Sequence, residues 1–158
     1  FSSKKIGKKL SHYLKEKDMY SEEEEINLKM IIGLSRTMQS ITKKQSRFIN
    51  EKSLTLPQFG VLEVLYHKGP LCINDIIEKT LSTSGNMTVV IENLRKDKYI
   101  EKKKDEIDQR KYIISLTQKG KMIIEEIFPT HLENLTKMLS KLEKLEKKEL
   151  LKLLKKLR

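Results

Sequence analysis

The chain has 158 residues, of which 37% are hydrophobic and 35% are charged. This length suits one compact domain and is too short for two ordinary ones. No apolar run approaches the ~18 residues of a membrane span, and the lysine-rich start lacks the apolar stretch of a signal peptide, so we expect a soluble, cytoplasmic protein. The single cysteine and three scattered histidines provide neither a disulfide framework nor a zinc-binding spacing. We therefore expect no metal and no cofactor.

The net charge of +11 comes from 33 Lys and Arg against 22 Asp and Glu. An excess of this size favours an anionic partner such as nucleic acid, although many basic proteins bind no DNA. No paired carboxylates, nucleophile with a base, or glycine-rich phosphate loop stands at a usable spacing. We therefore expect a binding protein and not an enzyme.

Residues 1–18 hold six lysines and few apolar anchors, which indicates a basic extension, either a short helix or a mobile arm. Ser21 and Glu24 then have the Ser-x-x-Glu spacing of a capping box. Apolar residues recur after them at intervals of three and four. The pattern predicts one long helix over residues 21–50 with one buried face.

Three shorter helices are predicted next. The first begins at Thr55 as N-cap, carries Pro57 in its first turn and ends near His67. The second is short and contains Ile73, Ile76 and Ile77. The third covers about residues 83–97, and helical spacing predicts a buried face of Met87, Val90, Ile91 and Leu94 opposite Ser84, Asn86, Thr88 and Val89.

Two strands, about 99–102 and 112–116, follow as a hairpin with a long polar tip. Thr117 is then expected to cap a helix that Pro129 ends. A second capping box at Thr130 and Glu133 is expected to begin a helix to the C-terminus. Its leucines have heptad spacing, but Glu146 and Glu149 interrupt the seam, so we expect one part of the helix to pack and another to face solvent.

Two short helices, a tight turn and a basic hairpin are typical of a winged helix-turn-helix. Small polar side chains at the start of a helix can approach base edges, and a helix N-terminus favours phosphate. Capping alone explains any single one of them, but four together before a hairpin favour DNA contact: Ser82, Thr83, Ser84 and Asn86. In the hairpin, basic residues flank an acidic tip, which fits phosphate contact; the alternative is a solvated hairpin.

From about Ile26 to Leu142 the sequence resembles the MarR (multiple-antibiotic-resistance regulator) family of bacterial transcription factors. The similarity rests on the segments Leu56-Pro57-Gln58-Phe59, Thr83-Ser84-Gly85-Asn86-Met87-Thr88, and Asp108-Gln109-Arg110 followed by Leu116-Thr117-x-x-Gly120. It implies a homodimer whose N- and C-terminal helices form the interface, with the helix at 83–97 in the major groove. It also implies that Arg110 reaches the minor groove while Asp108 braces the wing. Val89 departs from the Arg that family members often carry.

The fold class expected is mainly α (α+β). Residues 19–158 form a single MarR-like domain, with a winged helix-turn-helix over about 55–116 and dimerisation helices over about 21–50 and 117–158. The predicted DNA contacts are Thr83, Ser84, Asn86, Thr88, Val89, Lys102, Lys103, Lys104, Arg110 and Lys111.

The resemblance implies a ligand-responsive repressor that binds a near-palindromic operator in double-stranded DNA and answers a small aromatic or phenolic effector. The alternative is an architectural or protein-binding winged-helix protein without an effector. Effector-pocket candidates are Met38, Phe48, Phe59 and Tyr66, for which core packing is the alternative. Cys72 is interpreted as a small buried hydrophobe rather than a redox sensor, and His67 as a helix cap rather than an effector contact.

Overall fold

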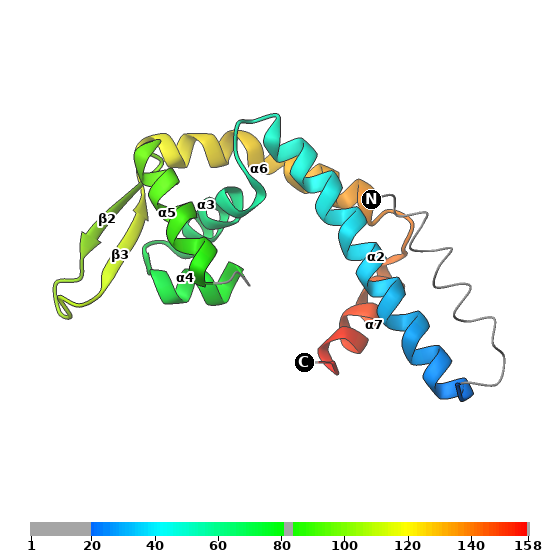
Figure 1. Cartoon of the computed structure of the whole chain (residues 1–158). Helices are drawn as coiled ribbons and strands as arrows, with labels where there is room; N and C mark the ends of the chain where they lie inside the picture. The colour runs from blue at the N-terminus through cyan, green and yellow to red at the C-terminus, as the bar shows by residue number, and fades with distance from the viewer. Residues whose placement is uncertain (1–19, 81–83, 158) are drawn as a thin grey trace. The chain divides into compact units, whose positions relative to one another are not determined.

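The computed structural model describes residues 20–80 and 84–157 (Figure 1). The chain divides into two units, residues 1–42 and 43–158, each described by itself. The long helix α2 (Glu22–Asn50) begins in the first unit and ends in the second. The predicted basic extension, residues 1–18, lies outside the described residues.

The first unit contains the predicted capping box. The Ser21 N–H donates to the Glu24 carboxylate at 2.7 Å, and the Glu24 N–H donates to the Ser21 hydroxyl at 3.3 Å. Four glutamates in the first turn complement the helix dipole. Large apolar side chains of this unit are 39–64% exposed, namely Ile26, Leu28, Met30, Ile31 and Met38. The helix therefore forms as predicted, but the predicted buried face is wrong for this unit, because its apolar side chains are exposed among the described residues.

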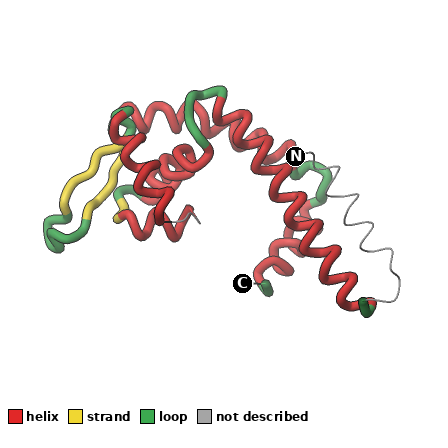
Figure 2. Tube along the Cα trace, in the orientation of Figure 1, coloured by secondary structure: helices red, strands yellow, loops and turns green. Residues whose placement is uncertain are grey.

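The second unit combines helices with a small antiparallel sheet (Figure 2). Its helices are α3 (Leu56–Lys68), α4 (Ile73–Thr80), α5 (Ser84–Lys96), α6 (Gln118–Met138) and α7 (Lys144–Lys155). Its strands are β1 (Leu71–Cys72), β2 (Ile100–Lys104) and β3 (Tyr112–Leu116), in the order β1-β3-β2. Leu71 lies opposite Ile114 in one pair, and Ile100 lies opposite Leu116 in the other. None of the helices in the described residues has both the length and the apolarity to cross a membrane.

The core of this unit lies between α3, α4, α5, α6 and the sheet. The predicted buried face of α5 is confirmed, because Met87, Val90, Ile91 and Leu94 are at most 6% exposed. Helix α3 begins as expected: the Thr55 N–H donates to the Gln58 side chain at 2.8 Å, and the Thr55 hydroxyl accepts from the Gln58 N–H at 3.4 Å. The remaining core residues are Ile49, Leu54, Phe59, Val61, Leu62, Leu65, Ile76, Ile100, Ile114, Ile124 and Ile127.

Thr117 caps a helix as predicted, but the predicted break at Pro129 and the predicted restart at Thr130 were wrong. Helix α6 continues through Pro129 to Met138, and α7 begins only at Lys144. Proline removes one backbone donor from a helix, but Ile127 and His131, on either side of it, are buried and hold both parts on the core. The next helix, α7, begins after Glu143, whose N–H donates to the Glu146 carboxylate at 2.7 Å.

The start of α6 explains the spacing Leu116-Thr117-x-x-Gly120. The Thr117 hydroxyl accepts from the Gly120 N–H at 3.0 Å and donates to the Lys98 carbonyl at 2.7 Å. A Cβ at Gly120 would overlap the carbonyl oxygen of Tyr99. The glycine therefore lets the first turn of α6 lie directly against the segment that leads into β2.

Candidate nucleic-acid interface

Helix α5 presents small polar side chains on the face opposite the core. Asn86 and Thr88 are exposed, and Val89 is 57% exposed. Met87, Val90 and Ile91, on the other side of the helix, are buried. Such side chains can reach base edges when the helix lies in a major groove. Thr83 and the side chain of Ser84, which were predicted to contribute, lie outside the described residues.

Strands β2 and β3 extend beyond the helices as a hairpin, the wing, which comprises residues 100–116 with its tip at 105–111 (Figure 1). Two aspartates organise this tip. The Asp105 carboxylate accepts from the Ile107 and Asp108 N–H groups at 2.9 and 2.7 Å, and these bonds hold the pKa of Asp105 below its usual range.

Asp108 continues the same network. Its carboxylate accepts from the Arg110 N–H at 3.1 Å and lies 3.6 Å from the Lys111 ammonium, and its carbonyl accepts from the Lys111 N–H at 2.8 Å. These bonds lie within the wing tip, and the bracing role that the family resemblance implies for Asp108 stays a prediction. Asp105 was missed, because one acidic residue in a charged loop gives no signal that it receives two backbone N–H groups.

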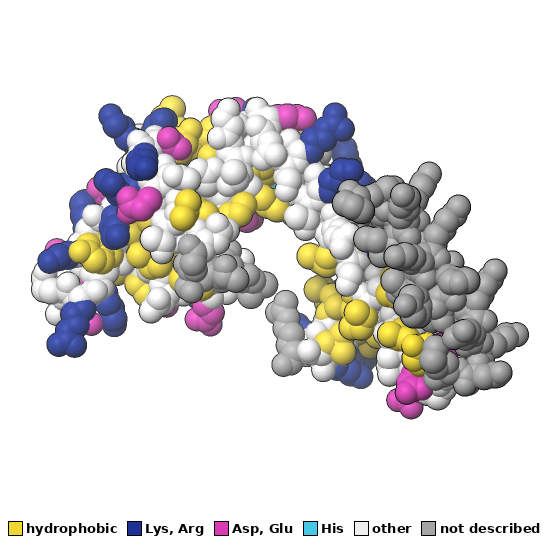
Figure 3. Space-filling model, in the orientation of Figure 1, with side chains coloured by type: hydrophobic (Ala, Val, Ile, Leu, Met, Phe, Trp, Pro, Cys, Tyr) yellow, Lys and Arg dark blue, Asp and Glu magenta, His cyan; other side chains and the backbone are white. Residues whose placement is uncertain are grey.

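The predicted cations gather on the wing, and Figure 3 shows Lys and Arg side chains at this end of the molecule. Arg110 and Lys104 are exposed, and Lys103 pairs with Glu101 at 3.0 Å. Exposed pairs of this kind contribute little free energy, so such a lysine can exchange its carboxylate for a phosphate at small cost.

Lys102 is held differently from the other wing lysines. Its ammonium lies 4.4 Å from the centre of the Tyr112 ring and 3.9 Å from the Glu92 carboxylate of α5, and its side chain is only 26% exposed. These contacts connect the wing to α5. The predicted phosphate contact by Lys102 would therefore require it to give up part of this packing.

A cleft of about 250 Å³ lies where the end of the wing tip and the start of β3 meet β1 and the start of α4. Arg110 and Lys111 line it together with Tyr112, Asn74, Cys72 and Ile73. The sequence did not predict this grouping, because the pairing of β1 with β3 brings together segments that are distant along the chain. Cys72 is half-buried, and so is less enclosed than predicted.

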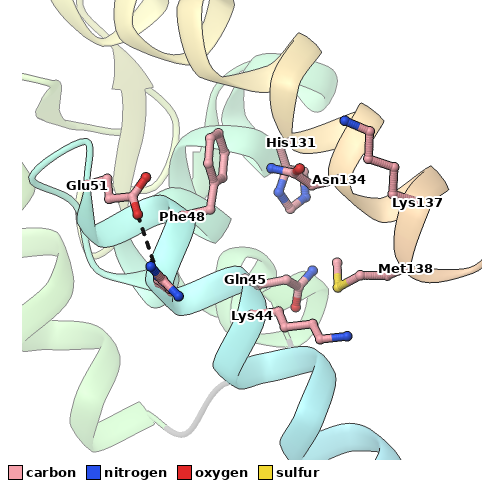
Figure 4. Close-up of a pocket in the computed structure, with 9 residues that line it drawn as sticks. Lys44, Gln45, Phe48, Glu51, His131, Asn134, Lys137 and Met138 are labelled. Carbon is pink, nitrogen blue, oxygen red and sulfur yellow. Dashed lines mark ion pairs between the residues drawn. The ribbon is translucent and has the colours of Figure 1, made fainter.

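A second pocket, of about 220 Å³, lies between the end of α2 and α6 (Figure 4). Its lining combines cations, amides and apolar groups: Lys44, Gln45, Arg47, Phe48, Glu51, His131, Asn134, Lys137 and Met138. His131 is 4% exposed, and its ring centre lies 4.6 Å from that of Phe59. Burial lowers the pKa of His131, which Glu63 opposes, so the neutral imidazole is favoured at this wall.

Of the four effector-pocket candidates from the sequence, Phe48 is the one that lines this pocket. Phe59 is a core residue behind His131, whereas Tyr66 is 37% exposed and its hydroxyl donates to Glu125 at 3.4 Å. Met38 belongs to the first unit. His67 packs its ring against Phe128, with centres 4.9 Å apart, and the C-cap of α3 is Gly69.

An exposed polar face on the second helix of a helix pair, followed by a basic antiparallel hairpin, defines a winged-helix DNA-binding protein. Residues 43–127 match the family described as transcriptional regulator SarA/Rot. The chain is 34% identical over 116 residues to the HTH-type transcriptional regulator MhqR of Bacillus subtilis, covering 73% of this chain and 80% of MhqR.

Two solved structures are also similar. One is BpsR of Bordetella bronchiseptica, whose DNA binding is regulated by 6-hydroxynicotinic acid; it is 26% identical, with a TM-score of 0.74 over 82% of this chain and 98% of BpsR. The other is a MarR-like regulator from Bacillus cereus, 25% identical, with a TM-score of 0.74 over 82% of this chain and 94% of that protein. The chain belongs to the SarA/Rot family of winged-helix transcriptional regulators, and the expected MarR-like fold is confirmed.

Proposed function

We propose that the protein is a homodimeric repressor that binds a near-palindromic operator and releases it when a small aromatic anion binds. The observation that carries this proposal is the outward face of α5, where Asn86 and Thr88 are exposed beside a basic wing. The opposite face of α5 is buried in the core. The similarity to regulators such as MhqR supports the same conclusion.

The DNA contacts divide by chemistry. Asn86 and Thr88, with Thr83 and Ser84 before them, are proposed to read base edges in the major groove. Arg110 is proposed to enter the minor groove, where a narrow A·T-rich segment concentrates negative potential. The phosphates are proposed to be bound by Lys103, Lys104 and Lys111. Lys102 can join them only if its ammonium moves away from the Tyr112 ring.

This division is tested by binding measured over a salt series, on operator DNA located by footprinting the region upstream of the protein's own gene. Asn86→Ala should reduce the ratio of specific to nonspecific affinity, by ~1 to 3 kcal/mol for a bidentate contact. Lys104→Ala should weaken all sequences equally and reduce the salt slope by about 1. Lys148→Ala on α7 removes the same charge and should leave both unchanged.

Arg110→Ala should cost more operator affinity than any other single substitution in the wing. If this variant bound the operator as tightly as the parent protein, the minor-groove role of the wing arginine would be wrong. If the parent protein showed no preference for any upstream sequence, the proposed regulatory function itself would fail.

A homodimer is proposed because both ends of the described chain carry uncovered apolar side chains. On α2 they are Ile26, Leu28, Met30, Ile31 and Met38, and on the C-terminal segment they are Leu132, Leu139, Leu145, Leu150, Leu151, Leu153 and Leu157. Exposed apolar side chains in such numbers support an interface. The dimerisation helices would then be about 21–50 and 117–158, and two-fold symmetry would place half-sites ~10 base pairs or a multiple apart.

The pocket between α2 and α6 is the proposed effector site. Phe48 and Met138 offer apolar contact to a ring, while Lys44, Arg47 and Lys137 offer charge to a carboxylate or phenolate. His131 and the amides of Gln45 and Asn134 add hydrogen-bonding groups. BpsR, which responds to an aromatic carboxylic acid, supports this ligand class.

Calorimetric titration with benzoate and 4-hydroxybenzoate tests the effector site. Lys137→Met should weaken binding of a carboxylate by about tenfold, since a charge-assisted contact contributes on the order of 1.5 to 3 kcal/mol. Tyr66→Phe, outside the lining, should have no effect. Binding that is lost in Tyr66→Phe and kept in Lys137→Met would place the site elsewhere.

A further inference from the structure

The apex of the wing carries an apolar side chain in full contact with solvent. Ile107 is 97% exposed, more than any other large hydrophobic residue among those described, of which the next is Leu145 at 75%. A single exposed apolar residue is common on proteins and by itself indicates nothing. Its position in the wing, however, is fixed by the loop around it.

The tip is closed by hydrogen bonds between its own residues. In addition to the bonds made by the Asp105 and Asp108 carboxylates, the Asp105 N–H donates to the Lys111 carbonyl at 3.0 Å. The two carboxylates thereby face backbone N–H groups of the loop. A tip ordered in this way presents the Ile107 side chain outward in one place, without a change of backbone conformation on binding.

Positive charge flanks this apex on both sides. Lys103 and Lys104 end β2, and Lys111, which follows the groove-directed Arg110, directly precedes β3. Cations on both arms of a hairpin match the two phosphate backbones that border a groove of DNA. A residue at the apex between them would lie over the interior of the groove, where sugars and base edges offer apolar contact.

We propose that Ile107 inserts into the minor groove beside Arg110 and packs against deoxyribose and base edges of the operator. This inference rests on the proposed DNA-binding function and adds an uncharged, shape-dependent contact to it. Apolar side chains are used by other minor-groove proteins in this way. Glu106, the exposed neighbour of Ile107, would be kept at the edge of the groove by the phosphates.

The test compares Ile107→Asn, Ile107→Leu and the parent protein on the footprinted operator over a salt series. Ile107→Asn should lose about tenfold in affinity, as expected when one aliphatic side chain no longer leaves water, with an unchanged salt slope because no charge is removed. Ile107→Leu should retain at least half of the parent affinity. Tyr66→Phe, which alters an exposed side chain of α3 outside the wing and the proposed dimerisation helices, is the control and should bind normally.

Equal affinity of Ile107→Asn and the parent protein would overturn the insertion, while specific binding by the parent would leave the proposed function intact. A loss accompanied by a reduced salt slope would also overturn it, since this would indicate a displaced wing rather than a lost apolar contact. Circular dichroism and the unfolding midpoint, which a solvent-exposed tip residue should not alter, verify that the variants are folded.

Discussion

The winged-helix part of the chain and its terminal helices use hydrophobic residues in opposite ways. The fifteen buried hydrophobic residues among those described all lie between Ile49 and Ile127 along the chain. In α7, all of which is described, no residue is buried, although Leu145, Leu150, Leu151 and Leu153 are on it. The winged helix therefore shares its core with Ile49 at the end of α2 and with Ile124 and Ile127 of α6, whereas α7 has apolar surface that a second chain can cover.

The largest effect is expected where the winged helix depends on one close approach. Gly120→Ala should destabilise the protein by about 3 kcal/mol or more, because the added methyl group would overlap the Tyr99 carbonyl. Gly33→Ala is the matched change in α2, where nothing lies within 4 Å, and should be stabilising by ~0.5 to 1 kcal/mol. Denaturant unfolding measures both, and equal effects would show that the Tyr99 contact is unimportant.

A charge on the apolar surface of α7 should come next. Leu151→Glu should raise the dimer dissociation constant by about 30-fold, close to 2 kcal/mol, because a leucine that is 60% exposed in the single chain would otherwise be buried at the interface. Lys148→Glu places the same carboxylate at another exposed position of α7 as a control. Sedimentation should detect monomers in the first variant, and unchanged dimers there would remove α7 from the interface.

A smaller loss is expected from the cap that joins the wing to α6. Thr117→Val removes the bonds to Gly120 and Lys98 and should cost ~1 kcal/mol of unfolding free energy. Thr117→Ser should restore it. Thr136→Val is the control, because it removes a hydroxyl that donates to the Leu132 carbonyl within α6, and it should change the unfolding free energy little. A loss in this control equal to that of Thr117→Val would contradict the capping role.

The smallest effect concerns His131, where the core of the winged helix reaches the pocket. Because burial lowers its pKa from 6.5, the unfolded chain binds the proton more readily, so stability is retained above about pH 6.5 and decreases as the pH falls below it. The Glu63 carboxylate favours the imidazolium and so opposes part of this shift. His131→Phe should show a smaller loss of stability between pH 7.5 and 5.5, and an identical loss would assign that pH dependence to other groups.

Several features could be determined from the sequence because they depend on neighbours along the chain. The Ser21–Glu24 and Thr55–Gln58 caps, the buried face of α5 and the two strands of the wing follow from spacings of two to four residues. The family resemblance, carried by short segments, gave the correct fold class. The exposed positions of Asn86 and Thr88 follow from the same helical spacing, whereas Arg110 was indicated by the family resemblance.

Other features were decided only by tertiary structure, because they depend on segments that are distant along the chain. Burial of Ile127 and His131 carries α6 through Pro129, against the local preference that predicted a break. The pairing of β1 with β3 forms the cleft at Arg110, and the packing of Phe59 behind His131 determines which face of α6 lines the pocket. Local spacing fixes which side of a helix is apolar, but only the packed chain determines what that side meets.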